Sequence, residues 1–257
     1  MPNPVPPELI ELLGKLSKTK LAYVSSVVTG LLGDMQQRRK EDSDLIDDVF
    51  LEEFGVALLA HHGTSARPMT KEQFERAVER VMKLAGRKAE RARAGNPGHD
   101  IDIDGVKFSL KTQADAHIKQ DSLWISKFME LGKGEWSDKP EQLKGLRAQF
   151  LHHMRNYERI LQLRAMSRKE EKGTKDYWRY ELVEIPKALL MEAADGELKM
   201  MLDSEQNPKP GYCIVTNGMG GVKFALYFDG GGERKLQIKD LKKDLCVVHA
   251  EWDFSPP

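Results

Sequence analysis

Hydrophobic positions repeat with two different periods along the chain, and the change between them divides it. From Ser43 to His62, apolar residues recur at the three- and four-residue spacing of a helix that buries one face. A second stripe of this kind begins after Thr70, and Gln73 three residues later completes a pattern typical of a helix start. Residues 1–95 are therefore predicted to be mostly helical.

The period changes to two residues in the segment HDIDIDGVKFSLKT. Apolar and polar residues alternate there on both sides of Asp104-Gly105, a dipeptide typical of two-residue hairpin turns. In such a hairpin Asp100 lies opposite Ser109, and Lys111 lies on the same face two residues further on. One face of the hairpin is then apolar, whereas the other carries carboxylates, a hydroxyl group and two lysines.

Helical and extended segments both follow this hairpin. The predicted helices lie near residues 121–131 and 139–156. The predicted strands cover residues 159–166, 177–185, 212–217, 222–228, 234–241 and 245–252, with a hairpin turn at the DGGGE sequence. The pattern predicts an α+β fold, which we divide into an N-terminal helical extension, residues 1–40, and one domain, residues 41–257.

Composition narrows the class of protein. Hydrophobic residues make up 40% of the chain and charged residues 31%, which is enough for a core and a solvated surface. The sequence has no apolar run of roughly 18 residues and no secretory signal pattern, so we expect a cytoplasmic protein without a membrane span. Cys213 and Cys246, the only cysteines, are too few for a disulfide scaffold or a four-cysteine zinc site.

The charges cancel in sum but are segregated along the chain. Forty basic and forty acidic residues argue against a general binder of polyanions, whose affinity depends on neutralising phosphates. Acidic residues nevertheless predominate from Asp34 to Glu53, and basic ones from Lys83 to Arg93 and from Lys144 to Lys187. Such segregation fits a local DNA-binding surface, and it equally fits ordinary solvated helix faces.

The polar face of the first hairpin suits phosphodiester hydrolysis. A carboxylate can hold Mg²⁺ together with a phosphate oxygen and several waters. The metal stabilises charge at the attacked phosphate, and a neighbouring lysine can orient the attacking water or neutralise developing charge. A hairpin with a charged solvent-facing side fits the same pattern without any chemistry.

The segment resembles the PD-(D/E)xK motif of restriction endonucleases and related DNA-repair nucleases. Matched residue by residue, Asp100 is the first, metal-binding Asp, Ser109 stands at the second acidic position and Lys111 is the catalytic lysine. The chain departs from the motif at His99, which replaces a proline, and at Ser109, because serine is a poor Mg²⁺ ligand. Asp102 is an alternative source of a carboxylate, although we favour Asp100 as the leading ligand.

The resemblance implies a central mixed β-sheet flanked by helices, in the restriction-endonuclease manner, with Mg²⁺ as the cofactor. Many members place a glutamate on a helix before the hairpin, where it reaches the metal through water. Glu53 lies within an apolar stripe and is expected here in that role, with Glu52 as the alternative. The implied activity is site-specific cleavage of double-stranded DNA, as in type II restriction enzymes, and a homodimer would supply a centre for each strand.

Two basic segments are candidates for DNA contact. The C-terminal hairpin is similar to one in some small restriction enzymes, and a two-stranded ribbon fits the major groove. Its candidate residues are Arg234, Lys235, Gln237 and Lys239. A loop near residues 167–175 offers Arg168, Lys169 and Lys172, although a flexible polar loop explains that segment equally well.

Three other functions are compatible with the sequence. A repair or structure-specific nuclease of the same fold would prefer branched or damaged DNA. A catalytically silent DNA-binding protein is suggested by Ser109, since it lacks the second carboxylate. An unrelated α+β binding module would neither bind nor cut DNA.

Overall fold

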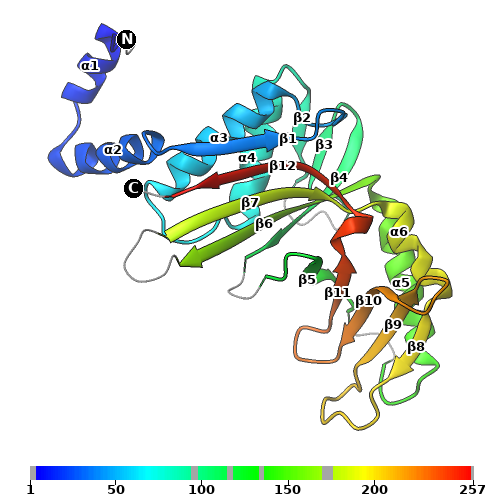
Figure 1. The fold of residues 1–257 in the computed structure, drawn as a ribbon. Coiled ribbons are helices and arrows are strands. Elements are labelled where there is room, and N and C mark those ends of the chain that lie inside the picture. Colours follow the sequence, from blue (N-terminus) through cyan, green and yellow to red (C-terminus); the bar gives the residue numbers. More distant parts are fainter. Residues whose placement is uncertain (1–3, 94–97, 115–117, 133–135, 170–175, 256–257) are drawn as a thin grey trace.

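Two β-sheets form the body of the molecule, and helices pack against them (Figure 1). The computed structural model describes residues 4–93, 98–114, 118–132, 136–169 and 176–255. The helices are α1 (Pro7–Gly14), α2 (Lys18–Leu31), α3 (Asp48–His62), α4 (Lys71–Leu84), α5 (Gln142–His153) and α6 (Lys187–Met191), with short 3-10 turns at Met154–Asn156, Glu192–Asp195 and Lys243–Leu245. The strands are β1 (Met35–Arg39), β2 (Ala89–Arg91), β3 (Ile101–Ile103), β4 (Val106–Gln113), β5 (Ser122–Glu130), β6 (Arg159–Lys169), β7 (Asp176–Glu184), β8 (Glu197–Met200), β9 (Gly211–Thr216), β10 (Val222–Asp229), β11 (Lys235–Lys242) and β12 (Val247–Phe254).

The larger sheet is mixed. Its seven strands run in the order β1-β12-β7-β6-β4-β3-β2, with β4 and β6 parallel and the other neighbours antiparallel. The second sheet has five antiparallel strands in the order β5-β11-β10-β9-β8. A central mixed sheet with flanking helices confirms the α+β fold that the sequence and the resemblance predict.

The larger sheet lies between two hydrophobic cores. On one face α3 and α4 pack against it, and the Phe54 ring centroid lies 6.1 Å from that of Phe74 and 4.9 Å from that of Trp252. On the other face, Ile160 and Val183 join a core with α5 and the second sheet. The central strands are thus covered on both sides over most of their length, so most of their side chains meet a packed layer.

The hairpin predicted around Asp104-Gly105 is present as β3 and β4. Both turn residues are left-handed, with φ of 53° and 85°, as a two-residue turn of this kind requires. Ile103 pairs with Val106 and Asp102 with Lys107, so the predicted register is confirmed. The apolar side of β4 faces the α3 and α4 core, and its alternate residues therefore face the second sheet.

The helix predicted at residues 121–131 is wrong, because the segment forms strand β5. Leu123 and Ile125 are buried and Trp124 between them is exposed, which is the alternation of a strand. Register shifts in the pairing with β11 then return Phe128 to the core, so the apolar spacing is irregular and mimics a helix. The partner strand is also remote in sequence, where local patterns give no sign of it.

Residues 1–40, the expected helical extension, contain two helices and then a strand. Strand β1 pairs with β12 at the edge of the larger sheet, whereas α1 projects away from the body (Figure 1). Helix α2 contacts α3 so closely that a Cβ atom on Gly30 would lie 2.6 Å from Gly63 Cα. A domain boundary at residue 40 stays a prediction. In the described part of the chain, no helix is both long and apolar enough to cross a membrane.

The last turn of α3 carries a buried histidine. His62 packs its ring against Trp178 and Phe254, and its Nε2 lies 2.8 Å from the Tyr180 hydroxyl oxygen. Its Nδ1 lies 3.1 Å from the Ser65 carbonyl oxygen, which can only accept, so Nδ1 carries the proton of a neutral ring. Burial lowers the pKa of His62 to about 4.

We expect the stability of the protein to fall in mild acid because of His62. Its pKa is about 4 in the folded chain and 6.5 in the unfolded chain, so the unfolded chain binds more protons between these values. The contribution of His62 to the free energy of unfolding is complete above pH 6.5 and decreases by about 2 kcal/mol by pH 5. Urea unfolding at pH 7.5 and pH 5.0 measures this loss, which should be smaller in His62→Gln. An equal loss in both proteins would contradict the assignment.

Candidate functional site

The polar face of the β3–β4 hairpin borders a cavity of about 470 Å³. Its walls come from α4, the hairpin, β5 and the end of α5. The lining residues are Lys71, Gly98, His99, Asp100, Ser109, Lys111, Phe128, Met129, Glu130 and His153. The structure thus brings together Asp100, Ser109 and Lys111, the three residues that match the motif.

Asp100 is held by three hydrogen bonds. The Leu110 amide donates to Oδ2 at 2.6 Å, the Ser109 hydroxyl donates to Oδ2 at 3.2 Å and the Lys71 ammonium donates to Oδ1 at 2.7 Å. Burial favours the neutral acid, but the Lys111 and Lys71 charges and these hydrogen bonds outweigh it and lower the pKa of Asp100. Asp100 is therefore an oriented, ionised carboxylate.

Lys111 is almost completely buried at the floor of the same cavity, with 8% of its surface exposed. Its Nζ lies 5.2 Å from the centroid of the Phe128 ring. Burial lowers the pKa of Lys111 to about 8, even though the nearby Asp100 carboxylate raises it. A buried lysine beside an ionised carboxylate is an arrangement more typical of a reaction centre than of a solvated hairpin face.

Ser109 and Asp102 take supporting positions. Ser109 is buried and donates its hydroxyl proton to Asp100, so it orients that carboxylate. Asp102 accepts a hydrogen bond of 2.8 Å from the Gly105 amide, which ties its side chain to the hairpin turn. Asp100 lines the cavity and Asp102 does not, a geometry that favours Asp100 as a metal ligand.

A glutamate that sequence reasoning missed lies beside Asp100. Glu75 on α4 shares the Lys71 ammonium with Asp100, at 3.4 Å from Glu75 and 2.7 Å from Asp100. Burial raises the pKa of Glu75 more than Lys71 lowers it, and the Asp100 carboxylate raises it further. Glu53, the residue expected here, instead places its carboxylate 3.8 Å from Arg80 on α4. The sequence does contain a sign that could have pointed to Glu75. This residue follows Phe74 of the buried stripe and lies on the helix immediately before the hairpin.

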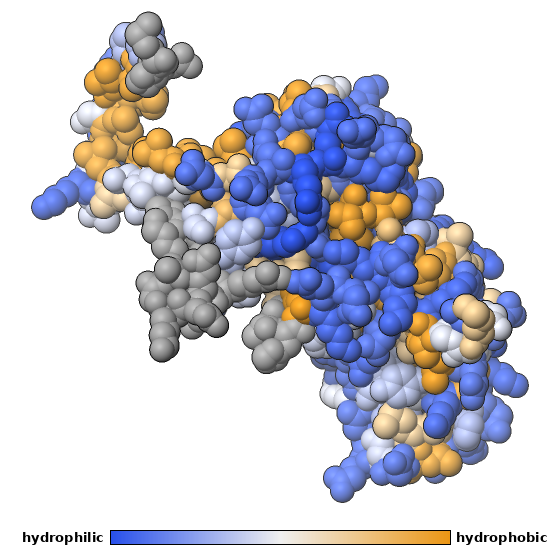
Figure 2. Space-filling view, in the orientation of Figure 1, coloured by the Kyte–Doolittle hydropathy of each residue, from blue (hydrophilic) through white to orange (hydrophobic). Residues whose placement is uncertain are grey.

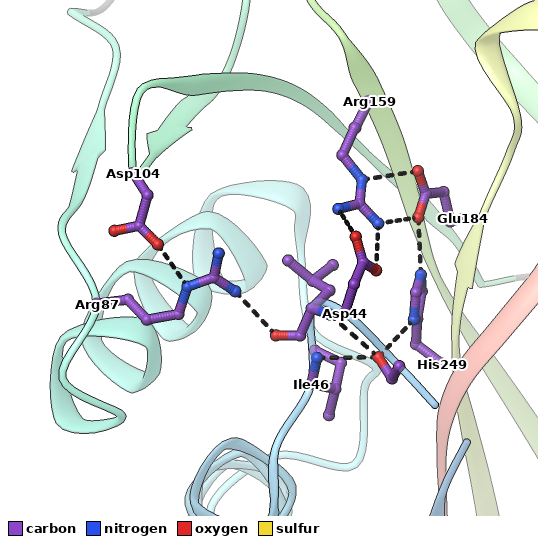
Figure 3. A network of polar contacts seen from close by, with 9 residues as sticks. Asp44, Ile46, Arg87, Asp104, Arg159, Glu184 and His249 are labelled. Carbon is purple, nitrogen blue, oxygen red and sulfur yellow. Dashed lines mark hydrogen bonds and ion pairs between the residues drawn. The ribbon is translucent and has the colours of Figure 1, made fainter. Parts of the chain in front are cut away.

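A second group of potential ligands surrounds an arginine. Asp44, Glu184 and His249 offer atoms within 4.8 Å of one another. The Arg159 guanidinium, however, donates to Asp44 at 2.7 and 2.9 Å and to Glu184 at 2.8 and 2.5 Å (Figure 3). Arg159 therefore already supplies the cation, and the cluster connects the loop before α3 to the larger sheet.

The four predicted DNA-binding residues of the C-terminal hairpin differ in their burial and in their contacts. The Gln237 side chain is buried; it accepts a hydrogen bond from Trp124 Nε1 and donates one to Asp229, so its amide is committed to the fold. Lys239 lies over the Tyr227 ring, 3.7 Å from its centroid, and is partly exposed. Lys235 pairs with Glu233 at 3.5 Å. Arg234 has φ of 42° and ends the loop before β11.

The predicted C-terminal hairpin is confirmed as β10 and β11, but it is not a free two-stranded ribbon. Strand β11 pairs with β5 and β10 pairs with β9, so both edges that a free ribbon would expose are paired within the five-stranded sheet. In the other candidate segment, Lys172 lies outside the described residues. Arg168 and Lys169 end β6, but their side chains also lie outside the described part.

The cavity at Asp100 continues along β5. A second cavity of about 350 Å³ shares Lys71, Lys111, Phe128 and Met129 with the first and extends to Thr112 and Ser126. The next residues along β4 and β5, Gln113 and Trp124, line a third cavity of about 290 Å³ together with Lys119 and Lys239. We call these three cavities together the β5 groove; the first contains Asp100 and the third contains Lys239.

Comparison with known proteins gives two matches over most of the chain. The family model of SmaI, described as a type II site-specific deoxyribonuclease, matches residues 9–254. The type II restriction enzyme SmaI of Serratia marcescens is 45% identical over 220 residues, which are 85% of this chain and 85% of the relative. No solved structure matches. The chain, with its cavity at the β3–β4 hairpin, belongs to the SmaI family of type II site-specific deoxyribonucleases.

Proposed function

We propose that this chain is a Mg²⁺-dependent restriction endonuclease of the PD-(D/E)xK superfamily, with its catalytic centre in the cavity around Asp100. The observation that carries the proposal is the pairing of an ionised, oriented Asp100 with the buried Lys111 on one hairpin face. Double-stranded DNA is the substrate, as for the restriction enzyme that it resembles. The site specificity of the family requires recognition of bases in addition to the cut itself.

Asp100, which lines the cavity, and Glu75 on the neighbouring helix α4 fit a divalent cation. Asp100 and Glu75 direct carboxylate oxygens at one cation, the Lys71 ammonium, which marks a place where positive charge is stabilised. Oxygen ligands and room for water are what Mg²⁺ prefers. Asp100 would bind the ion directly, with Glu75 as the second carboxylate. When bound, Mg²⁺ would stabilise the charge that develops at the attacked phosphate.

The protein's own groups have separate tasks in this proposal. The Leu110 amide and the Ser109 hydroxyl fix the carboxylate of Asp100, so Ser109 acts through Asp100. The Lys111 ammonium orients the attacking water and offsets the negative charge of the phosphate during attack. Phe128 and the surrounding core keep bulk water from Lys111, which strengthens both interactions.

Plasmid and phage DNA test the nuclease directly. The wild-type protein should give discrete fragments with Mg²⁺ and none with EDTA. Asp100→Asn and Lys111→Met should each lower the cleavage rate about 10²-fold or more, because each removes a charge at the reacting phosphate. Binding of DNA without scission under all conditions would instead indicate the catalytically silent DNA-binding protein. Cleavage of branched or damaged DNA alone would indicate a repair nuclease.

A pair of glutamate variants tests the carboxylate on α4. Glu75→Gln should lower the cleavage rate at least tenfold and raise the Mg²⁺ concentration needed for half-maximal rate, because it removes a ligand charge. Glu53→Gln is the matched control and should stay within about twofold of the wild type, since Glu53 faces Arg80. If the effects of the two variants were exchanged, the assignment of Glu75 would be wrong.

We further propose that DNA lies along the β5 groove and that Lys239 contacts a phosphate at its far end. Lys239→Gln should weaken DNA binding and reduce the slope of log affinity against log salt by about one. Gel shifts without Mg²⁺, at several salt concentrations, measure this slope. Lys144→Gln on α5 is the control for an exposed lysine outside the groove. Equal slopes for Lys239→Gln and the wild type would contradict the placement.

The N-terminal helices provide a surface for a homodimer. Helix α1 buries none of its residues, and Leu9 and Leu12 on it are 45% and 60% exposed. Figure 2 shows the apolar side chains of α1 and α2 gathered on this projecting arm. Acidic Glu8 and Glu11 lie on α1, and basic residues begin α2, so two copies can align opposite charges. A second copy also supplies a centre for the second DNA strand.

Sedimentation equilibrium tests this arrangement. The wild-type chain should be a dimer at micromolar concentration, and the double variant Leu9→Lys/Leu12→Lys should be a monomer, because charge opposes burial of the arm. Leu202→Lys changes a leucine that is 59% exposed on the body and should leave the dimer intact. A wild-type monomer, or a double variant that still dimerises, would rule out the arm as the interface.

A further inference from the structure

A histidine of α5 lines the same cavity as the motif residues. His153 is the last residue of α5 and lines the cavity together with Asp100 and Lys111. The wall on this side also carries Phe128, Met129 and Glu130. Glu130 is exposed and pairs with Lys127 at 2.9 Å, and its negative charge would repel a phosphate. His153 is therefore the group on this wall that can donate a hydrogen bond to an anion.

The His153 ring is fixed by two aromatic neighbours. Its centroid lies 6.1 Å from that of Phe128 and 5.5 Å from that of Tyr157, and both contacts are edge-on. Phe128 and Tyr157 are buried, so they hold the ring against the core. Because Lys111 lies over the same Phe128 ring, this side chain sets the positions of both polar groups.

The ring nitrogens are available and uncharged. Within the described residues, no hydrogen bond engages either nitrogen of His153. Burial and the Lys111 ammonium lower the pKa of His153 to about 4, although Asp100 raises it, so the ring is neutral near pH 7. A neutral imidazole keeps one N–H donor, and it adds no third positive charge beside Lys71 and Lys111.

We propose that His153 is a further catalytic residue, whose ring N–H donates a hydrogen bond to a non-bridging oxygen of the phosphodiester in the cavity. The inference rests on the proposed nuclease centre at Asp100. A phosphate in the cavity would meet Lys111, Asp100 and His153, which all line it. This hydrogen bond becomes stronger as negative charge grows on the phosphate oxygen during attack. It therefore raises the rate of cleavage more than the affinity for DNA.

Three variants separate the donor from the packing of the ring. His153→Phe keeps an aromatic ring against Phe128 and Tyr157 but removes both nitrogens. His153→Gln restores an N–H donor in place of the ring. His152→Phe is the matched control, because His152 is exposed and its side chain points about 100° away from that of His153 around the helix axis. Thermal unfolding verifies that each variant is folded.

Single-turnover cleavage with excess protein and Mg²⁺ gives the rate, and gel shifts on the same DNA with Ca²⁺ give the affinity. His153→Phe should cut about 10²-fold more slowly with its affinity within about threefold of the wild type. His153→Gln should cut at least tenfold faster than His153→Phe, and His152→Phe should cut at the rate of the wild type.

Two results would overturn the inference while the proposed nuclease stands. The first is a His153→Phe variant that cuts within about threefold of the wild type while Lys111→Met is inactive. The second is a folded His153→Gln variant as slow as His153→Phe, which would exclude a donor role. A wild-type protein that cuts no DNA would overturn both the nuclease and this inference.

Discussion

The alternation of side chains along β4 is the constraint on which the site depends. Because β4 is covered on both faces, its apolar residues pack against α3 and α4 while Ser109 and Lys111 must enter the opposite layer. A lysine in that layer is tolerated only with a charged partner, and Asp100 at the start of the hairpin provides it. The fold therefore enforces the proximity of carboxylate and amine that phosphodiester chemistry uses.

The two sheets contribute different kinds of residues to the site. The larger sheet, with α4, supplies the charged groups Asp100, Glu75, Lys71 and Lys111. The second sheet and α5 supply the wall around Phe128, whose buried ring shields Lys111 from solvent and so strengthens the electrostatic interactions of its ammonium. Because the cavity lies between the layers, small changes in their packing would alter the distance between the groups on opposite walls.

The same arrangement places further cavities beside the site along β5. Strand β5 is the edge of the second sheet nearest to β4, and its exposed residues border the β5 groove over its length. Lys239 at the far end is positioned by aromatic rings of the neighbouring strands, which limits its freedom before any ligand binds. The proposed centre for cleavage and the proposed DNA contact at Lys239 thus both border β5 or its partner strand.

The sequence alone determined the features that depend on neighbours along the chain. The Asp104-Gly105 turn, the register of the β3–β4 hairpin and the Thr70–Gln73 start of α4 follow from local backbone preferences and short-range hydrogen bonds. That register is enough to place Asp100, Ser109 and Lys111 on one face. Residues this close in a hairpin have few alternative arrangements.

Only the tertiary structure decided contacts between remote segments. Strand β5 forms because β11 pairs with it, in spite of an apolar spacing that suggests a helix. The proximity of Glu75 to Asp100 depends on how α4 lies against the hairpin, and the position of His153 depends on where α5 ends. Gln237 is buried and not available on the surface because its amide forms hydrogen bonds with Trp124 and Asp229, which are remote from it in sequence or on the partner strand. Packing of distant elements sets these distances, and no local pattern encodes them.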